Sequence, residues 1–572
     1  MPDHSAGQTV YTLAARCRDC YRCLKVCPVK AIRMTDGQAH IDESKCIQCG
    51  ACLSQCPQGA IILRGDVAAA ETLLDGSSPV AASVDPAFAA EFSGWQKKRL
   101  LGALRKLGFK HIAETAAGAA YAARTSYDIM QNGRGSAHIC TACPAAVNFI
   151  ERHRPDLAEN LLPVASPMIM HARHIRALLG AETKVVYIGP CSARKAEAQR
   201  PANAGLVDAV LTFRELRVWL GKRKIDLANC EESDFDDTPN GNARLIPLAG
   251  GLPDTSGPAD GLSPLELLTV TGPHGVKKAL DAVKDGMALN LNPLFCTDGC
   301  LNGPGMSASG NVFKRRAEMK AYIAETPVGK NELRQDVETS AEYSARAPQD
   351  ERIFSEEEIT RVLALTGKAD VQQQLNCGAC GYDSCRKKAI AVLSGMAEPE
   401  MCIPYMRRLA EQRSDLVIEN NPNGIVVLNS SLEIKSMNPA FRALFQCTDE
   451  IIGRPLSYLM DAEPFEKVLT ETQSSLTVTA NHPRYGIICR QIIYPLKDEK
   501  SIVGVFMPMD SGEHAKLHIQ KLKDQTVAQA REMLEYQVAM AQKIARYLGE
   551  STAKTEELAK KLSQLNADAD EN

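Results

Sequence analysis

Two runs of cysteine near the N-terminus constrain the fold of this chain more than any other feature. Residues 17–27 and 46–56 each contain four cysteines in the pattern C-x2-C-x2-C-x3-C, and proline follows each run at once. Residues 1–10 lack the charged start and apolar core of a secretory signal, so we expect a cytoplasmic protein. In a reducing compartment, 20 cysteines indicate metal ligation or redox chemistry rather than structural disulfides.

The repeated pattern is that of bacterial two-cluster ferredoxins, which residues 1–66 resemble. In that family three closely spaced thiolates hold one 4Fe-4S cubane, and the fourth thiolate crosses to the other cluster. The resemblance implies one cluster on Cys17, Cys20, Cys23 and Cys56, and a second on Cys27, Cys46, Cys49 and Cys52. Residues 31–41 and 60–63 would form its short strands. Two structural zinc sites are the alternative, which neither the spacing nor the repeated Cys-Pro favours.

From about residue 79 to residue 326 the sequence alternates between apolar strands and amphipathic helices. Residues 184–188 indicate a buried strand that leads into the loop of Cys191. Residues 208–212 indicate another strand, and residues 213–220 the helix that follows it. This alternation predicts an α/β domain whose site residues lie on loops at strand ends.

Three loops of this predicted domain carry cysteine beside small residues or proline. They contain Cys143 in T-A-C-P, Cys191 in G-P-C-S-A-R, and the pair Cys296 and Cys300 in F-C-T-D-G-C. Four thiolates from three loops would form one site. A zinc centre that combines Cys140 and Cys143 with Cys296 and Cys300 is the alternative.

These signatures resemble those of the catalytic domain of iron-iron hydrogenases, here within residues 75–350. The family patterns are T-S-C-C-P, M-P-C-x-x-K-x-x-E and M-A-C-x-x-G-C-x-x-G-G-G. The resemblance implies that Cys143, Cys191, Cys296 and Cys300 hold the cubane of an H-cluster. It also implies that Cys300 bridges to the two-iron subsite of that cofactor.

The chain departs from the family pattern at residues that resemblance assigns to catalysis. Ala142 stands where the family has a cysteine that relays protons, and alanine cannot hold a proton, so we predict slow turnover. Arg194 replaces a lysine that contacts cyanide, which keeps the charge without the compact ammonium geometry, and Glu197 follows it. Gly189 and Leu294 replace two methionines.

Other interpretations of these residues stay open at this point. Cys140 lies two residues before Ala142, and we expect its side chain to point away from the site rather than to replace the relay. Arg194, Lys195 and Glu197 are alternatively solvated charges.

Residues 326–351 form a polar stretch, which we expect to be an excursion of the α/β domain or a linker. A second kind of cysteine domain follows and covers residues 351–410. Its cysteines are Cys377, Cys380, Cys385 and Cys402. The spacing resembles the small 4Fe-4S domain of electron-transfer and corrinoid proteins, which implies one further cluster. Zinc is the alternative, because four thiolates alone do not distinguish the two metals.

The C-terminal part resembles a signalling module. Residues 411–510 resemble a PAS domain, with N-P-N-G-I-V-V-L at residues 421–428 and M-N-P-A-F at residues 437–441. Nothing there indicates haem or flavin, so a coupling or dimerisation module is favoured over a ligand sensor. In residues 511–572, apolar residues at steps of three and four predict a helix that forms a coiled coil or packs on the PAS domain.

Together these features predict a multidomain α/β and α+β protein that resembles a sensory iron-iron hydrogenase. It would bind and slowly, reversibly split dihydrogen, and pass electrons through 4Fe-4S clusters to the PAS module. We expect a redox partner protein, a kinase or phosphatase on another chain, and a homodimer. The net charge of −3 gives no reason to expect nucleic acid or a membrane as partner. A metabolic hydrogenase, or an iron-sulfur redox protein without the two-iron subsite, is the alternative.

Overall fold

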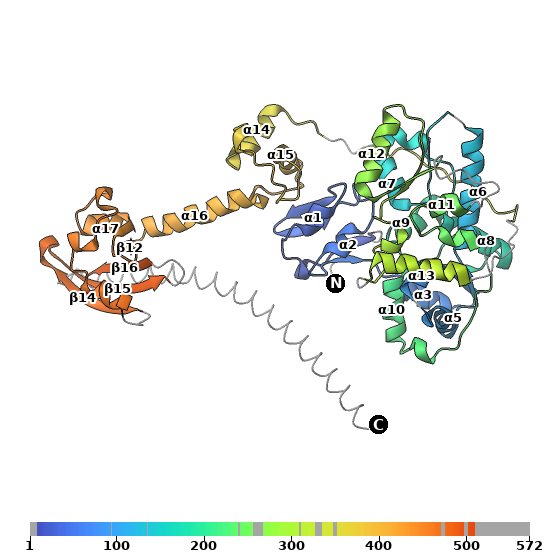
Figure 1. Cartoon of the computed structure of the whole chain (residues 1–572), viewed down its shortest axis with the longest axis horizontal. Coiled ribbons are helices and arrows are strands. Elements are labelled where there is room, and N and C mark those ends of the chain that lie inside the picture. Colours follow the sequence, from blue (N-terminus) through green and yellow to red (C-terminus); the bar gives the residue numbers. More distant parts are fainter. Residues whose placement is uncertain are drawn as a thin grey trace, which may run out of the picture. The chain divides into compact units, whose positions relative to one another are not determined.

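The computed structural model describes residues 8–92, 94–133, 135–237, 241–255, 267–307, 310–325, 334–346, 352–470, 475–496 and 501–509. The chain divides into two compact units, with the division between Met406 and Arg407, and each is described by itself. Figure 1 gives the element labels used below. The helix expected at residues 511–572 lies outside the described residues.

Two antiparallel strand pairs and two short helices form the N-terminal domain. β1 (Val10–Thr12) pairs with β4 (Ile61–Leu63), and β2 (Ile32–Thr35) pairs with β3 (Gln38–Ile41). α1 (Arg22–Val26) and α2 (Ala51–Gln55) each contain the third cysteine of a run and end directly before the fourth. In each run, a short helix therefore separates the third cysteine from the fourth.

A four-stranded parallel sheet forms the centre of the next domain, in the order β6-β5-β8-β9. Its strands are β5 (Val80–Val84), β6 (His111–Glu114), β8 (Lys184–Gly189) and β9 (Ala209–Thr212). Nearly all of their residues are buried. Continuous apolar strands of this kind occur where helices cover both faces of a parallel sheet.

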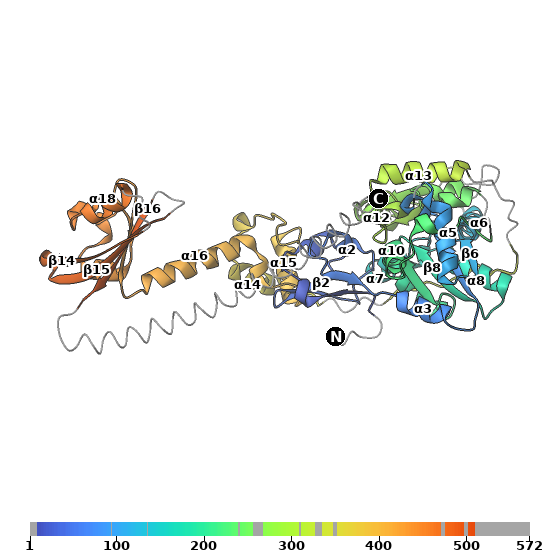
Figure 2. The same ribbon diagram turned by 90° about the horizontal axis from the view of Figure 1, so that it is seen from below.

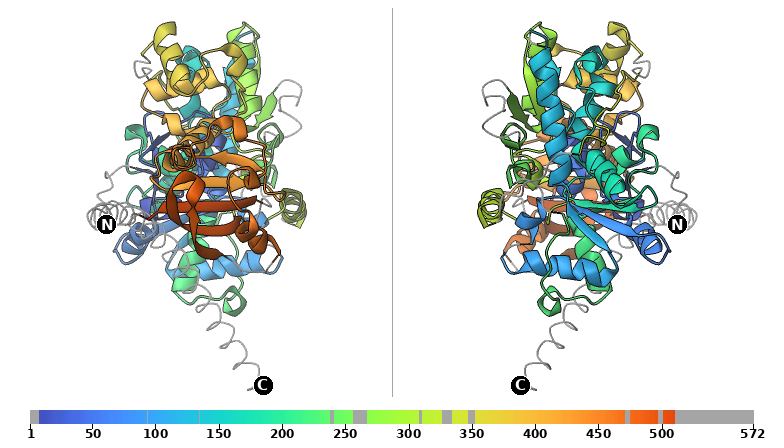
Figure 3. Two further views of the ribbon diagram at one scale, coloured as in Figure 1. Left: turned by 90° about the vertical axis from the view of Figure 1, so that its left-hand side faces the viewer. Right: turned by 90° about the vertical axis from the view of Figure 1, so that its right-hand side faces the viewer.

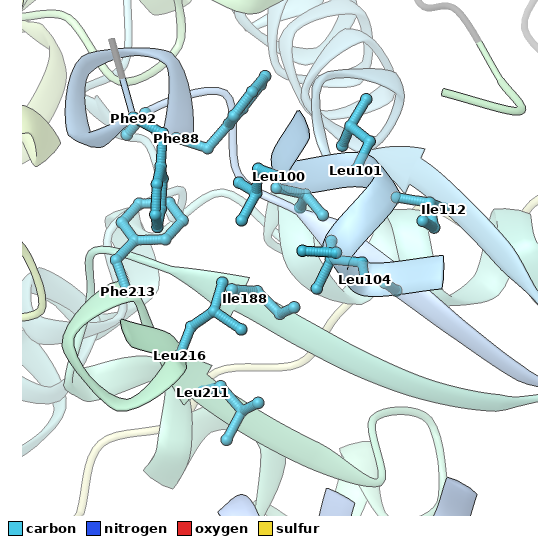
Figure 4. Packing of buried hydrophobic residues seen from close by; sticks show 14 of the residues in the cluster. Phe88, Phe92, Leu100, Leu101, Leu104, Ile112, Ile188, Leu211, Phe213 and Leu216 are labelled. Carbon is cyan, nitrogen blue, oxygen red and sulfur yellow. The ribbon is translucent and has the colours of Figure 1, made fainter. Parts of the chain in front are cut away.

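Alternate strand residues enter two separate cores on the two faces of this sheet. On one face Ile188 and Leu211 pack against α5 (Gln96–Leu107) and α10 (Phe213–Lys222), as Figure 4 shows. On the other face Val185 and Tyr187 share a core with residues of α6 (Ala116–Asn132) and α8 (Pro167–Leu179). α6 and α8 lie side by side there (Figure 3, right).

A second parallel sheet, in the order β10-β11-β7, completes this domain. Its strands are β7 (His138–Ile139), β10 (Leu268–Thr271) and β11 (Asn290–Leu294). α7 (Pro144–His153) and α12 (Gly272–Lys284) pack on it around Ile139, Phe149 and Leu291. The domain also contains α3 (Val67–Leu74), α4 (Phe88–Glu91), α9 (Ala193–Ala198), α11 (Gly251–Thr255) and α13 (Val312–Glu325).

The polar stretch expected to be an excursion or a linker packs on this domain over its described part, residues 334–346. Val337 is buried in the core of α6 and α8, and Ser340 forms a β-bridge with Val164. The Tyr343 hydroxyl donates a hydrogen bond to the Val164 carbonyl oxygen at 3.0 Å. Of the two expected alternatives, an excursion of this domain describes these residues and a linker does not, because a few well-placed contacts anchor a segment that has few apolar residues.

The small four-cysteine domain lies against the N-terminal domain. α14 (Glu356–Leu365) and α15 (Cys385–Leu393) pack on each other, and α16 (Ile403–Glu419) continues the chain across the division between the two units. Tyr382 and Met396 share an apolar cluster with Leu24 and Met34 of the N-terminal domain. The Met34 amide donates a hydrogen bond to the Met396 carbonyl oxygen at 3.1 Å.

The second unit is built on a five-stranded antiparallel sheet in the order β13-β12-β16-β15-β14. Its elements are β12 (Gly424–Leu428), β13 (Ile434–Met437), α17 (Pro439–Leu444), α18 (Glu463–Thr470), β14 (Leu476–His482), β15 (Ile487–Leu496) and β16 (Ser501–Pro508). Figure 2 shows α18 against this sheet, whose core includes Phe441, Phe465 and Phe506. The fold as a whole confirms the expected multidomain mixture of α/β and α+β parts. None of the described helices is long and apolar enough to cross a lipid bilayer.

Close packing of α6 on α8 predicts a large cost for the substitution Gly118→Ala. A Cβ atom at Gly118 would lie 2.1 Å from the Pro167 carbonyl oxygen, which is backbone and cannot easily move. We expect this substitution to lower the free energy of unfolding by about 1–3 kcal/mol.

Gly221→Ala on α10 is the matched control, because a Cβ there meets no atom within 4 Å. It should be neutral or stabilising by up to about 1 kcal/mol. Both tryptophans, Trp95 and Trp219, lie in this domain, so their fluorescence during urea unfolding reports it specifically. Equal urea midpoints for the two variants would contradict the packing argument.

Candidate metal centres

The three cysteine loops of the α/β domain all follow the carboxyl ends of parallel strands. Cys143 follows β7 and is the residue before α7, and Cys191 follows β8. Cys296 follows β11, and Cys300 begins the 3-10 helix Cys300–Asn302. Strand carboxyl ends are where open α/β sheets place their ligand sites.

Gly303 lets the last two of these loops approach each other. A Cβ atom at Gly303 would lie 2.5 Å from the Pro190 carbonyl oxygen. The Gly305 amide donates a hydrogen bond to the same oxygen at 2.8 Å. The loop after Cys300 is thereby fixed against the loop that carries Cys191.

The four cysteines of these loops line a single cavity, called here the central cavity. It contains about 490 Å³ of space free of protein atoms. Its wall is formed by Cys49, Asp85, Ala142, Cys143, Pro144, Ala145, Tyr187, Pro190, Cys191, Arg194, Leu294, Phe295, Cys296, Cys300 and Gly303. The structure thus brings together Cys143, Cys191, Cys296 and Cys300, and it adds Cys49 from the N-terminal domain.

The eight cysteines of the two N-terminal runs and the four of the small domain line three further cavities. Cys17, Cys20, Cys23 and Cys56 line one, and Cys27, Cys46, Cys49 and Cys52 line another. Cys377, Cys380, Cys385 and Cys402 line the third. Four thiolates around one cavity fit either a zinc ion or an iron-sulfur cluster, so the donor set alone does not distinguish the two metals.

Burial makes the central thiols dependent on a metal for ionisation. It raises the pKa of Cys191 to about 11, and burial together with neighbouring cysteines raises the pKa of Cys296 well above its ordinary value. Burial and Asp85 do the same to the pKa of Cys300. Thiolates are the ligand form of cysteine, and metal binding releases the thiol protons. The donor set therefore fits an iron-sulfur cofactor.

Arg194 ties the wall of the central cavity together. Its Nη1 donates a hydrogen bond to Glu197 Oε2 at 2.5 Å, and its Nη2 donates one to the Ala142 carbonyl oxygen at 2.9 Å. Burial opposes the charge, but Glu197 and other neighbours hold the pKa of Arg194 well above its ordinary value. Lys195 is also buried and pairs with Asp66 and Glu215. The interpretation of this charged segment as solvated is wrong.

Cys140 does not belong to the central cavity. Its side chain is buried in the core that contains Tyr121 and Met168, and burial raises the pKa of its thiol to about 12. Cys143 instead packs with the apolar cluster of the second sheet. The two thiols therefore face different sides, which removes the basis for a zinc centre on this pair and for Cys140 as a proton relay.

Sequence reasoning missed Asp85 and Tyr187, which line the central cavity. Tyr187 Oη donates a hydrogen bond to Asp85 Oδ2 at 2.8 Å, and the Ala87 amide donates one to Asp85 Oδ1 at 2.9 Å. Burial raises the pKa of Asp85, while these donors and Arg194 partly counter it. The available signal was Asp85-Pro86 directly after the buried strand β5. Both side chains can hold a proton at the cavity wall.

The four cysteine groups are arranged as neighbours within the first unit. Cys49 lines both the central cavity and one cavity of the N-terminal domain. A hydrogen bond of 2.8 Å from Ser192 Oγ to the Gln48 carbonyl oxygen joins the domains at this point. On the other side of the N-terminal domain, Cys380 and Cys23 belong to one apolar cluster. The cysteine groups therefore adjoin one another along the first unit.

Comparison with protein families matches four parts of the chain. Residues 78–304 match the model of the iron only hydrogenase large subunit, C-terminal domain, and residues 9–57 match a 4Fe-4S dicluster domain. Residues 373–404 match an Fe-S cluster domain, and residues 412–478 match a PAS domain.

Among curated proteins, the chain is similar to the NADP-reducing hydrogenase subunit HndD of Solidesulfovibrio fructosivorans, with 28% identity over 218 residues. The aligned region covers 33% of this chain and 37% of that protein. The chain is 26% identical over 277 residues to iron hydrogenase 1 of Clostridium pasteurianum, over 40% and 48% of the two chains. The cytosolic Fe-S cluster assembly factor NAR1 of Vanderwaltozyma polyspora is 33% identical over 95 residues, 16% of this chain and 18% of that protein. The chain thus spans less than half the length of these relatives.

Among solved structures, a variant of the FeFe-hydrogenase HydA1 from Chlamydomonas reinhardtii aligns with 49% of this chain and 99% of its own, at 16% identity and a TM-score of 0.40. The family matches indicate iron-sulfur clusters as cofactors. The chain therefore carries an iron-only hydrogenase large-subunit domain, combined with a 4Fe-4S dicluster domain, a further Fe-S cluster domain and a PAS domain.

Proposed function

We propose that the protein is a sensory iron-iron hydrogenase that binds and slowly, reversibly splits dihydrogen. The central cavity carries this proposal, because four cysteines from three loops line it and Ala142 forms its wall. Asp85, Tyr187 and Arg194 line the same cavity beside these cysteines.

Each of the four cysteine groups would hold one 4Fe-4S cubane. Cys300 would bridge from the central cubane to a two-iron subsite. When bound, this subsite would supply the open iron at which dihydrogen is split into a proton and a hydride equivalent. Arg194 fixes the wall of this site, because Glu197 and the Ala142 carbonyl oxygen hold its guanidinium in place.

Ala142 supports the slow rate that we propose. Its methyl group can neither accept nor donate a proton, so this part of the wall offers no relay. Asp85 and Tyr187 can hold protons on the same wall. Asp85 directly follows β5 and Tyr187 lies on β8, so neither is a sequence neighbour of Cys143.

Electrons from dihydrogen would pass to the N-terminal clusters near Cys49 and reach the small domain beside Cys380. We infer that the PAS domain reports the redox state of this chain to a kinase or phosphatase on a separate chain. A redox partner protein would set the resting state of the clusters. Dimerisation through the PAS domain and residues 511–572 is part of the same proposal.

An iron-sulfur redox protein without the two-iron subsite is the second candidate. The similarity to an Fe-S cluster assembly factor over 95 residues favours it. The loss of both family methionines, at Gly189 and Leu294, points the same way.

Infrared spectroscopy separates the two candidates. Protein matured with the complete cofactor should show bands of iron-bound carbon monoxide and cyanide, and these bands should change under dihydrogen. Cys300→Ser should remove the bands while the N-terminal clusters stay reducible. A matured protein with no such bands would contradict the hydrogenase and leave the redox protein.

Ala142→Cys should raise dihydrogen turnover by about tenfold or more, because it places a proton-carrying thiol on the cavity wall. Ala145→Cys is the matched control, since Ala145 also lines the cavity and gains the same thiol at another place. The rate with an artificial electron acceptor measures the effect. Equal rates in both variants would contradict the assignment of Ala142 as the missing relay.

In protein reconstituted with cubane clusters alone, Cys143→Ala should lower the iron and sulfide content by about four each per chain, because it removes one ligand of a 4Fe-4S cluster. Cys140→Ala, three residues earlier, should leave both contents unchanged, since that thiol faces an apolar core. Metal and sulfide analysis of purified protein gives the answer. A loss of iron and sulfide in Cys140→Ala but not in Cys143→Ala would contradict the assignment of ligands.

A further inference from the structure

Lys368 contacts two cysteines of the small domain directly. Its Nζ atom lies 3.0 Å from Cys402 Sγ and 3.5 Å from Cys385 Sγ, within hydrogen-bond distance for sulfur. Lys368 is only 6% exposed and lines the cavity that these cysteines share. Its backbone is fixed, because its amide donates to the Leu363 carbonyl oxygen at 2.8 Å, at the end of α14.

A second buried lysine lines the same cavity. Lys388 of α15 is 4% exposed, and its Nζ donates a hydrogen bond to the Pro399 carbonyl oxygen at 2.7 Å. Buried lysines are rare unless they are paired. Two of them beside one group of thiolates indicate that the group carries compensating negative charge.

Cations also lie near the N-terminal cysteine groups: Arg18 and Arg22 line the cavity of Cys17, and Lys30 and Arg152 lie near Cys27 and Cys46. The hydrogen bonds to Cys27, Cys46 and Cys56 come from backbone amides, at 3.2–3.4 Å. A neutral amide stabilises added negative charge less than a hydrogen-bonded ammonium group does. Charge and hydrogen bonds at the sulfur atoms are known determinants of cluster potential. Reduction adds one negative charge, so the ammonium group favours the reduced form.

The four cysteines of the small domain lie at the start of α16. Cys402 directly precedes α16, and Ile403 and Pro404 of that helix line the same cavity. α16 then continues across the division between the two units. A change of charge at this cluster therefore occurs at the start of the helix that leads to the PAS domain.

We propose that Lys368 makes the cluster of Cys377, Cys380, Cys385 and Cys402 the most easily reduced of the three accessory clusters. One electron leaves a reduced cluster of the N-terminal domain, which is oxidised, and enters this cluster, which is reduced. No bond forms or breaks. The source of the electron rests on the proposed function, whereas the order of the potentials does not.

The test is a redox titration of the full chain with its cubane clusters reconstituted, followed by electron paramagnetic resonance. Cys377→Ser identifies the signal of the small domain. Lys368→Met should shift the reduced-to-oxidised ratio of this cluster at fixed potential at least tenfold toward the oxidised form, about 59 mV for one electron. The two N-terminal clusters should keep their potentials, and Lys368→Arg should keep most of the wild-type value.

Lys387→Met is the matched control, because Lys387 lies on α15, pairs with Asp383 at 2.8 Å and is mostly exposed. In this variant the reduction potential of the small-domain cluster should equal that of the wild type. Lys368→Gln keeps a hydrogen-bond donor without the charge, and it replaces the methionine variant if iron analysis shows that the latter has lost a cluster.

Equal potentials in the wild type and the uncharged variant would overturn the inference. A wild-type potential below those of the N-terminal clusters would also overturn it. The titration uses neither dihydrogen nor the two-iron subsite. A failed prediction in this titration would therefore not contradict the proposed hydrogenase. Missing infrared bands would in turn not contradict the order of the cluster potentials.

Discussion

The burial of thiols at strand ends is the constraint on which this structure depends. Cys191, Cys296 and Cys300 are held where burial raises their pKa, so without a bound cation they are neutral thiols. Neutral thiols are poor ligands, and only the positive charge of a metal makes thiolates favourable at such depth. Formation of the site and binding of its cofactor are therefore coupled. The parallel sheets supply the rigid frame that keeps the three loops together.

Arg194 shows how a planar cation can join two parts of a site. A guanidinium has a planar fork of donors, so it can bond to two acceptors at once, whereas an ammonium acts as a compact point charge. Here the fork joins Glu197 to the Ala142 carbonyl oxygen. Ala142 is thus held by its backbone, while its methyl group cannot carry a proton. In the proposed hydrogenase, this fixed residue is the one that lacks the relay.

Much of this arrangement could be predicted from the sequence, because cysteine spacing and buried strands are strong local signals. The strand before Cys191 and the two N-terminal cysteine runs are examples. Other features depend on contacts between distant segments. In sequence Lys368 looks like an ordinary loop residue, and Asp85 is marked only by its place directly after a strand. Neither feature reveals that Asp85 faces the central cavity or that Lys368 contacts two sulfur atoms. Residues 334–346 were expected to be an excursion or a linker because they have few large apolar side chains, yet Val337 is buried.

Two cysteines, Cys20 and Cys377, are exposed, and they belong to different groups on the proposed electron route. A cluster near the surface can exchange electrons with a partner, so the route has two exits. An enzyme that serves metabolism needs fast exit of electrons at either group. A sensor instead needs an electron to remain where its charge changes the protein. The ammonium group of Lys368 lies at the exit beside α16, and there it would hold the electron next to the helix that continues into the second unit. Slow proton transfer at the central cavity is compatible with this use, because the signal depends on cluster occupancy and not on turnover.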